Sequence, residues 1–288
     1  MRRHLSLDLN RHTSPLGMMA SSVPAMAGSD AAEPGEHIDG PQGKLRIHRS
    51  GSGPRILFLH ADAGRSAQWR EVIGLVSTEF ETCAVDFRGH GASDPAANGD
   101  YSFLGRAKDA LAVVNELDWD QFLVVSHSGG CAAALALAAE QPERVRGMLL
   151  VDPATDPRVI PKEVMADMLS GLSGPDSLSY LKRYYTSIAG PDQTVQSRVL
   201  ADAEATTAAS RSGVGNALAE WKPEAALDGY KGPMLILGTD ISDGANALYA
   251  LRPNIPHRVV HGTGHWLQIE HPMMVADAIR ELAKNAPQ

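Results

Sequence analysis

Two kinds of hydrophobic pattern alternate along this chain after residue 43. Short apolar runs with many β-branched residues predict buried strands, and longer segments with apolar residues at helical spacing predict helices. The predicted strands cover 44–48, 55–60, 82–87, 122–125 and 145–151, and the predicted helices between them cover 69–76, 102–117 and 131–137. The polar–apolar alternation of the first strand predicts an exposed edge strand. The whole series predicts an α/β fold with a doubly wound, mostly parallel sheet.

The alternation stops between residues 153 and 230, where no segment has a convincing strand pattern and the signals are helical. It resumes with strands predicted at 233–238 and 258–261 and helices predicted at 245–251 and 272–283. We therefore expect a core made of residues 43–152 and 231–288, with a helical insert before the penultimate strand. Such an insert lies over the carboxyl ends of the strands, where ligands bind in open α/β sheets. We predict that it is a lid, although each Met or Tyr in it, taken singly, is explained as well by simple packing.

The N-terminal 42 residues follow neither pattern. They begin with an Arg-Arg pair at positions 2–3, carry no charge from 13 to 29, and include an Ala-Met-Ala sequence at 25–27 that resembles a signal-peptidase site. These features are typical of a twin-arginine export signal, but prolines interrupt the apolar stretch. We favour a disordered tail on a cytoplasmic protein, with export as the alternative. In both cases we expect the folded core to begin near Gly43.

Composition narrows the classes of function. The 288 residues are 43% hydrophobic and 21% charged, which is ordinary for one large globular domain with an insert. A formal net charge of −8 without a basic cluster argues against nucleic-acid binding. No apolar run approaches the roughly 18 residues of a membrane span. Cys83 and Cys131 fall in predicted core elements without the spacing of a metal site, so we expect neither a disulfide nor a bound metal.

The strongest chemical signal lies at residues 122–130. A strand-like run ends in the sequence Ser-His-Ser-Gly-Gly (126–130), and a helical segment of small residues follows at once. A serine in so sharp a strand-to-helix turn must adopt strained backbone angles, and the small residues two positions before and after it leave room for the turn. Such a nucleophile elbow exposes the oxygen of Ser128 and aims the next backbone N–H, that of Gly129, at an oxyanion. The alternative for Ser128 is an inert helix-capping serine.

A serine hydroxyl needs a base, because it is a poor nucleophile at neutral pH. His265 directly follows the last predicted strand, and the glycines before it free its loop to bring the imidazole toward the elbow. His261 and His271 are weaker alternatives. A second oxyanion donor is expected from the loop after the strand at 55–60, where the backbone N–H of Ala61 is our candidate.

Four blocks of the sequence, in order, resemble those of lid-bearing α/β-hydrolases: His60-Ala61, 86–94, the elbow around Ser128, and 262–272. The likeness covers about residues 43–283. It implies an α/β-hydrolase fold and a Ser–acid–His triad that needs no cofactor, but it implies no substrate, because this fold hosts many chemistries. In such proteins the Arg-Gly-His-Gly block is mainly structural, so the resemblance gives Arg88 and His90 no catalytic role.

The sequence departs from this family at two places. Ala61 stands where glycine is usual, which keeps the backbone donor but adds a methyl group. The usual acid position after the penultimate strand holds Ile241, with Asp240 one residue early and Asp243 two residues late. Asp152 ends the strand before the lid, as the acid does in haloalkane dehalogenase-like relatives. We favour Asp152 over Asp240 and Asp243, each of which could instead be a turn or capping residue.

These residues predict a serine hydrolase that cleaves a small carboxylic ester or lactone. Ser128 attacks the acyl carbon, His265 moves the proton to the leaving oxygen, and the N–H groups of Ala61 and Gly129 bind the oxyanion. A serine at the elbow argues against epoxide hydrolase and haloalkane dehalogenase chemistry, where the resembled proteins use aspartate. Carbon–carbon bond hydrolysis, perhydrolase activity and a non-catalytic ligand sensor on the same scaffold stay open. Neither the substrate nor the oligomeric state follows from the sequence.

Overall fold

The computed structural model describes residues 35–286, and the structural statements below concern these residues alone. The predicted twin-arginine signal and its cleavage site lie outside the described residues. The folded core begins before the expected boundary at Gly43, because strand β1 (Glu36–Gly40) pairs antiparallel with β2 (Gly43–Ser50). Only Ile38 of β1 belongs to the hydrophobic core, so its polar sequence gave no strand signal. The strand predicted at 44–48 is therefore not an edge strand.

One sheet with the strand order β1-β2-β4-β3-β5-β6-β7-β8 forms the centre of the described residues. The pairs β1–β2 and β2–β4 are antiparallel, and every other pair of neighbours is parallel. The remaining strands are β3 (Arg55–Leu59), β4 (Glu81–Val85), β5 (Phe122–His127), β6 (Val145–Val151), β7 (Met234–Thr239) and β8 (His257–Val260). The predicted α/β class with a mostly parallel sheet is confirmed.

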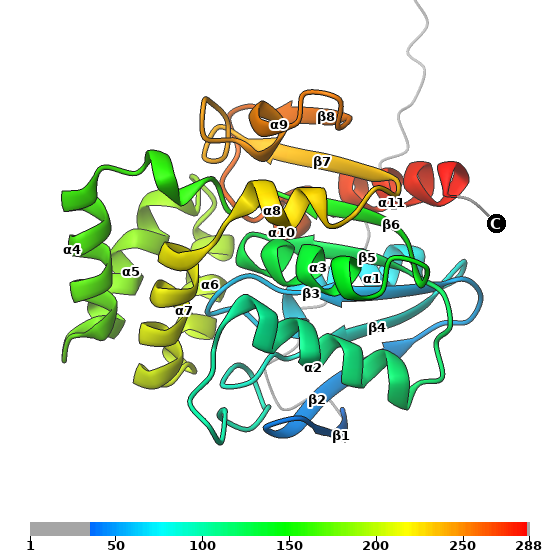
Figure 1. The fold of residues 1–288 in the computed structure, drawn as a ribbon, viewed down its shortest axis with the longest axis horizontal. Helices are drawn as coiled ribbons and strands as arrows, with labels where there is room; N and C mark the ends of the chain where they lie inside the picture. The colour runs from blue at the N-terminus through cyan, green and yellow to red at the C-terminus, as the bar shows by residue number, and fades with distance from the viewer. Residues whose placement is uncertain (1–34, 287–288) are drawn as a thin grey trace, which may run out of the picture. The chain divides into compact units, whose positions relative to one another are not determined.

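Helices cover both faces of this sheet (Figure 1). One face carries α2 (Phe103–Glu116), α3 (Gly129–Glu140) and α8 (Pro223–Asp228), and the other carries α1 (Arg70–Val76) and α11 (Pro272–Asn285). Three short helices complete the core: η1 (Ser66–Trp69), α9 (Leu248–Leu251) and α10 (Leu267–Glu270).

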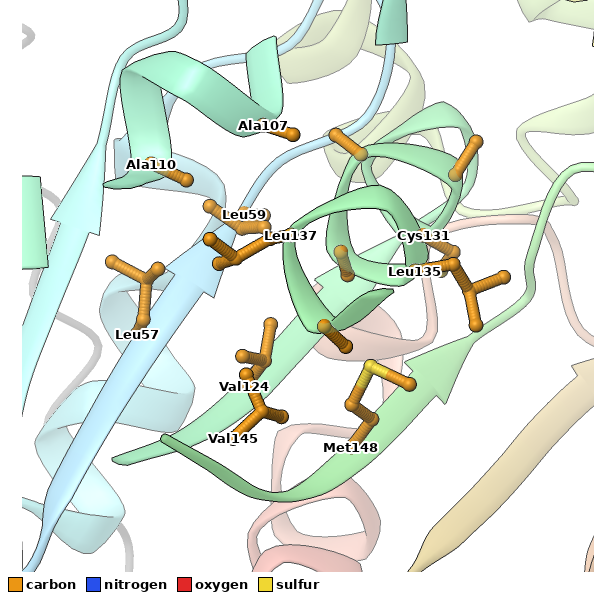
Figure 2. Close-up of a cluster of buried hydrophobic side chains, with 14 of the residues drawn as sticks. Leu57, Leu59, Ala107, Ala110, Val124, Cys131, Leu135, Leu137, Val145 and Met148 are labelled. Carbon is orange, nitrogen blue, oxygen red and sulfur yellow. The ribbon is translucent and has the colours of Figure 1, made fainter. Parts of the chain in front are cut away.

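Alternate residues of the buried strands supply the two hydrophobic cores. Val124 of β5 faces α2 and α3, whereas Val125 faces α1 and α11, as the two-residue repeat of a strand requires. Figure 2 shows the first of these cores, which includes side chains from two strands and two helices: Leu57, Leu59, Val124, Ala107, Ala110, Leu135 and Leu137. Cys83 and Cys131 are buried and free, and burial raises the pKa of both thiols. Both are core residues, as the sequence predicts.

A helical insert separates β6 from β7 and lies beyond the carboxyl ends of the strands (Figure 1). It consists of η2 (Pro157–Val159), α4 (Lys162–Ser173), α5 (Ser177–Ile188), α6 (Gln193–Glu204) and α7 (Ala208–Glu220). The insert has a hydrophobic core of its own, which packs against Trp266 and Ala63 of the sheet domain. It ends earlier than the predicted limit at residue 230, because α8 packs on α3 and Leu227 belongs to the main core.

Candidate active site

Ser128 lies between the end of β5 and the start of α3, as the elbow motif predicts. Its φ of 52° and ψ of −123° place it in a region that residues with a side chain rarely adopt. Gly130 makes the turn possible, since a Cβ atom there would lie 2.4 Å from the carbonyl oxygen of His60. The side chain of Ser128 makes no capping hydrogen bond to α3 and instead lines a cavity. These contacts do not support the alternative of a helix-capping serine.

His265 and Asp152 meet beside this cavity. The Nδ1–H group of His265 donates a hydrogen bond to Oδ2 of Asp152, so Nε2 is the ring nitrogen left free. Both residues are buried, and His265 lines the same cavity as Ser128. Asp152 directly follows β6 and has a φ of 39°, a strained angle for an aspartate. The structure thus brings together the three residues that the sequence favours as a triad.

The carboxylate of Asp152 is held by three further donors. Thr239 donates from its backbone N (2.7 Å) and its Oγ1 (2.9 Å), and Ser242 donates from its Oγ (2.5 Å). Burial acts to raise the pKa of Asp152, but the facing imidazole of His265 and these hydrogen bonds outweigh it, so the pKa lies below its ordinary value. Asp152 therefore stays ionised at neutral pH and fixes the orientation of the His265 ring.

The two alternative acids make other contacts. Asp240 accepts hydrogen bonds from the Nδ1 of His261 (2.6 Å) and from the following glycine amide (2.9 Å), and its side chain is half exposed. Asp243 accepts a hydrogen bond from the hydroxyl of Tyr249. Among the hydrogen bonds and ion pairs of residues 35–286, none joins either aspartate to His265. The alternative base His261 is exposed, and its Nδ1 bonds Asp240 rather than a residue of the favoured triad.

The loop after β3 runs beside the start of α3. His60 donates from Nδ1 to the carbonyl of Ala61 (2.6 Å) and accepts at Nε2 from the backbone N of Phe87 (3.0 Å). Burial lowers the pKa of His60 to about 4, so its ring is neutral. The amide of Gly129 is the first of α3 and has no partner within the helix. Ala61 is buried outside the cavity lining, whereas the next residue, Asp62, lines the cavity.

His127 supports the His265 loop, a role that the sequence did not reveal. The side-chain amide of Gln268 donates to Nδ1 of His127 (2.9 Å), which assigns the hydrogen to Nε2, and Nε2 donates to the carbonyl of His265 (2.9 Å). Burial and the nearby His265 lower the pKa of His127 well below its ordinary value. The elbow motif leaves this position free, so no sequence signal marked it. His271, the other alternative base, is exposed at the start of α11.

The cavity has a volume of about 310 Å³ and is enclosed by two sets of side chains. Residues of the sheet domain, including Ser128, His265 and Asp62, form what we call the floor. Residues of α4, α5 and α7 form what we call the roof: Val164, Met168, Leu172, Tyr180, Leu181, Tyr184, Tyr185, Ile188, Ser210, Arg211, Val214, Gly215 and Leu218. The two are joined where the hydroxyl of Tyr185 donates to the backbone carbonyl of Asp62. The insert therefore encloses the cavity that Ser128 and His265 line.

Within residues 35–286, no helix is long and apolar enough to cross a membrane. No group of three or more His, Cys, Asp or Glu side chains there is arranged to hold a metal ion.

Comparisons with known proteins agree with this architecture. A 2-(acetamidomethylene)succinate hydrolase of Mesorhizobium japonicum is 34% identical over 108 residues, which cover 38% of this chain and 38% of the relative. The chain spans less than two fifths of the length of the curated relatives it matches first, at 35 to 38%. Sequence similarity to these proteins is therefore local.

Solved structures match over most of the chain. A thermophilic esterase from Thermogutta terrifontis has a TM-score of 0.76 at 19% identity, covering 88% of this chain and 100% of that one. An enol-lactonase from Burkholderia xenovorans LB400 has a TM-score of 0.75 at 16% identity, covering 86% and 100%. At such identities the likeness establishes the fold alone. The family model for the alpha/beta hydrolase fold matches residues 54–272, more than half of the chain, and the protein belongs to this family.

Proposed function

We propose that this protein is a serine hydrolase that cleaves a carboxylic ester or lactone through an acyl-enzyme intermediate. The observation that carries the proposal is the hydrogen bond between His265 and the buried Asp152, on the same cavity as the strained Ser128. An imidazole held by an ionised carboxylate, beside a serine at a strand-to-helix turn, is the arrangement of a nucleophile with its base and orienting acid.

In the proposed reaction, Oγ of Ser128 attacks the acyl carbon while Nε2 of His265 takes the hydroxyl proton. Asp152 stabilises the imidazolium and stays ionised. The same proton passes to the leaving alkoxide, and a water molecule activated by His265 then hydrolyses the acyl-enzyme. Within this family, ester and lactone hydrolysis need the same groups, because a lactone differs only in keeping its leaving oxygen tethered.

The oxyanion of the tetrahedral intermediate would be bound by the amide of Gly129 and by a second amide from the loop after β3. Ala61 remains our candidate for the second donor. The cavity lining adds the neighbouring amide of Asp62, because Asp62 reaches the cavity and Ala61 does not. The amides of Ala61 and Asp62 belong to the same short loop. Loss of the amide that binds the oxyanion is expected to lower kcat by about 10²- to 10³-fold.

Two structural relatives, an esterase and an enol-lactonase, agree with this proposal by name. The name of the Mesorhizobium relative contains a succinate, a compound with two carboxyl groups. In this chain the cavity lining includes both a carboxylate, that of Asp62, and a guanidinium, that of Arg211. The charges of the lining therefore select neither an anionic nor a neutral acyl part.

A fluorophosphonate probe tests the proposal, because it reacts with activated serines. We expect the protein to be labelled at Ser128, the Ser128→Ala variant to be unlabelled, and a matched Ser126→Gly variant to be labelled like the parent. Ser126 is a suitable control because it is a buried serine two positions before Ser128. Glycine, the residue that replaces it in the control, is the one that the family motif usually has at this position. A panel of p-nitrophenyl esters of increasing chain length, with lactones beside them, then identifies the class of bond cleaved. The absence of labelling, with no hydrolysis in the panel, would contradict the proposal.

A further inference from the structure

Asp62 lies in the loop after β3, and the proposed triad does not use its carboxylate. It lines the catalytic cavity, and its side chain keeps 19% of its surface exposed. One carboxylate oxygen, Oδ1, accepts a hydrogen bond from Nη1 of Arg106 at 2.5 Å. A carboxylate has about four acceptor positions on its two oxygens, so Oδ2 is available to a group inside the cavity.

The buried Arg106 explains how a carboxylate is kept at this place. The Arg106 side chain is fully buried, and its guanidinium lies over the rings of Phe87 (5.6 Å) and Phe103 (5.3 Å). Its Nε and Nη2 have no hydrogen-bond partner among the described residues. A buried cation is costly unless it faces an opposite charge, so the pair with Asp62 stabilises the ionised form of both side chains.

Gly129 fixes the position of the Asp62 carboxylate relative to the nucleophile. A Cβ atom at Gly129 would lie 2.3 Å from Oδ2 of Asp62 and 2.4 Å from Oδ1, so the carboxylate occupies the space where a side chain would stand. Gly129 directly follows Ser128, and its amide is a proposed oxyanion donor. An acyl carbonyl bound there brings the carbon atoms next to it toward Asp62.

We propose that Asp62 determines specificity by accepting a hydrogen bond from an O–H or N–H group on the acyl part of the substrate, one or two carbons from the carbonyl. The inference rests on the proposed function. It names the substrate class as esters or lactones of acids that carry a hydroxyl or amino group near the carbonyl. Simple alkanoates would leave Oδ2 of Asp62 without a donor in a largely apolar cavity.

The test compares matched substrates on the unaltered protein. The p-nitrophenyl esters of 3-hydroxybutyrate and 2-hydroxybutyrate are each paired with the corresponding methoxy ester, which keeps the oxygen but has no hydrogen to donate. Butyrate itself is the reference. We expect kcat/KM for at least one hydroxy ester to exceed that of its methoxy partner by on the order of tenfold or more, since a hydrogen bond to a charged acceptor is lost in the partner.

Variants then assign the preference to Asp62. Asp62→Ala is expected to reduce the hydroxy-to-methoxy ratio to near one, and Asp62→Asn is expected to give an intermediate ratio. Asp243→Asn, a carboxylate outside the cavity lining, is the matched control and should keep the parental ratio. Because Asp62→Ala leaves Arg106 unpaired, an Asp62→Ala/Arg106→Met variant provides a second comparison without a buried unpaired charge.

Three results would overturn the inference. A ratio near one in the unaltered protein, with butyrate hydrolysed, would reject the role of Asp62 and leave the proposed function intact. An equal loss for all substrates in both Asp62 variants would assign Asp62 a structural role through Arg106. A protein that hydrolyses none of the esters and takes no fluorophosphonate label would reject the proposed function, and the inference with it.

Discussion

The floor and the roof of the cavity are built by different forces. Ser128 on the floor and Asp152 beside it are held at strained backbone angles, and four hydrogen bonds fix the carboxylate of Asp152. On the roof, apolar and aromatic side chains of α4 and α5 pack against one another and against Trp266 and Ala63 of the sheet domain. Positions in the floor therefore tolerate little displacement, whereas the roof can change its side chains and keep its packing. We expect changes in the floor to alter the rate and changes in the roof to alter the choice of substrate.

The largest effect is expected at the nucleophile. Ser128→Ala should fold normally, because the smaller side chain fits the same turn, and kcat for p-nitrophenyl butyrate should fall by about 10⁶. Steady-state kinetics with an intact circular dichroism spectrum measure this. Retention of more than a few per cent of the activity would mean that Ser128 is not the nucleophile and that the floor is not the reacting surface.

The acid is expected to give the next largest effect. Asp152→Asn should lower kcat by about 10⁴, because an amide cannot stabilise the imidazolium of His265. Asp240→Asn is the control and should change kcat by less than about threefold, since Asp240 bonds His261 at the exposed end of β7. The double variant shows whether the two carboxylates compensate for one another. If Asp240→Asn alone abolished activity, the acid would be Asp240.

We expect acid to destabilise the protein first through buried histidines of the sheet domain. Burial lowers the pKa of His60 from 6.5 to about 4, and burial with the nearby His265 lowers the pKa of His127 in the same direction. The unfolded state then binds more protons than the folded state as pH falls below about 6.5, so stability is complete above that pH and declines toward pH 4, by about 3 kcal/mol for His60 alone. Residues 153–230 contain no histidine, so no histidine of the insert contributes to this decline.

Urea unfolding at several pH values measures this effect. The free energy of unfolding should fall between pH 6.5 and pH 4.5, and a His127→Gln variant should show a shallower fall. Asp152 acts at lower pH, because its pKa is already below the ordinary value: its contribution is present above about pH 4 and is lost as pH falls through the lowered pKa. A stability that is constant from pH 7 to pH 5 would show that His60 and His127 are not buried in their neutral forms.

The same contrast explains how far the sequence could predict this molecule. Buried strands and the elbow are local patterns, so β3 to β6, the start of the insert and the turn at Ser128 were predicted within a few residues. The contact between His265 and Asp152 joins positions 113 residues apart, and the sequence could only rank Asp152 above its alternatives. Because parallel strands end side by side, several aspartates at the carboxyl edge of the sheet were candidates to contact the imidazole of His265. The strand register, which the sequence does not give, decides among them.

Other features depend on contacts that leave no local signal. Asp62 and Arg106 pair across 44 residues of the sequence. The helical pattern of α2 predicts that Arg106 lies on the buried side of the helix, but it does not predict a charged partner for this side chain. Strand β1 is polar because one face of it is exposed, and α8 looks like part of the insert until its packing on α3 is seen. In each case the missing information is which distant surface covers the segment.

The smallest effect on the rate is expected for a substitution in the roof. Such a substitution tests most directly whether the floor controls the rate and the roof controls the choice of substrate. Met168 of α4 lines the cavity and is half buried, so Met168→Ala should enlarge the cavity and cost less than about 2 kcal/mol of stability. We expect the ratio of kcat/KM for p-nitrophenyl octanoate over butyrate to rise about tenfold, with kcat for butyrate within a few-fold of the parent. Met273→Ala, an exposed methionine of α11 outside the cavity, is the matched control. A fall in kcat for every ester in Met168→Ala, with no change in the ratio, would mean that the roof positions the reacting groups as strictly as the floor does.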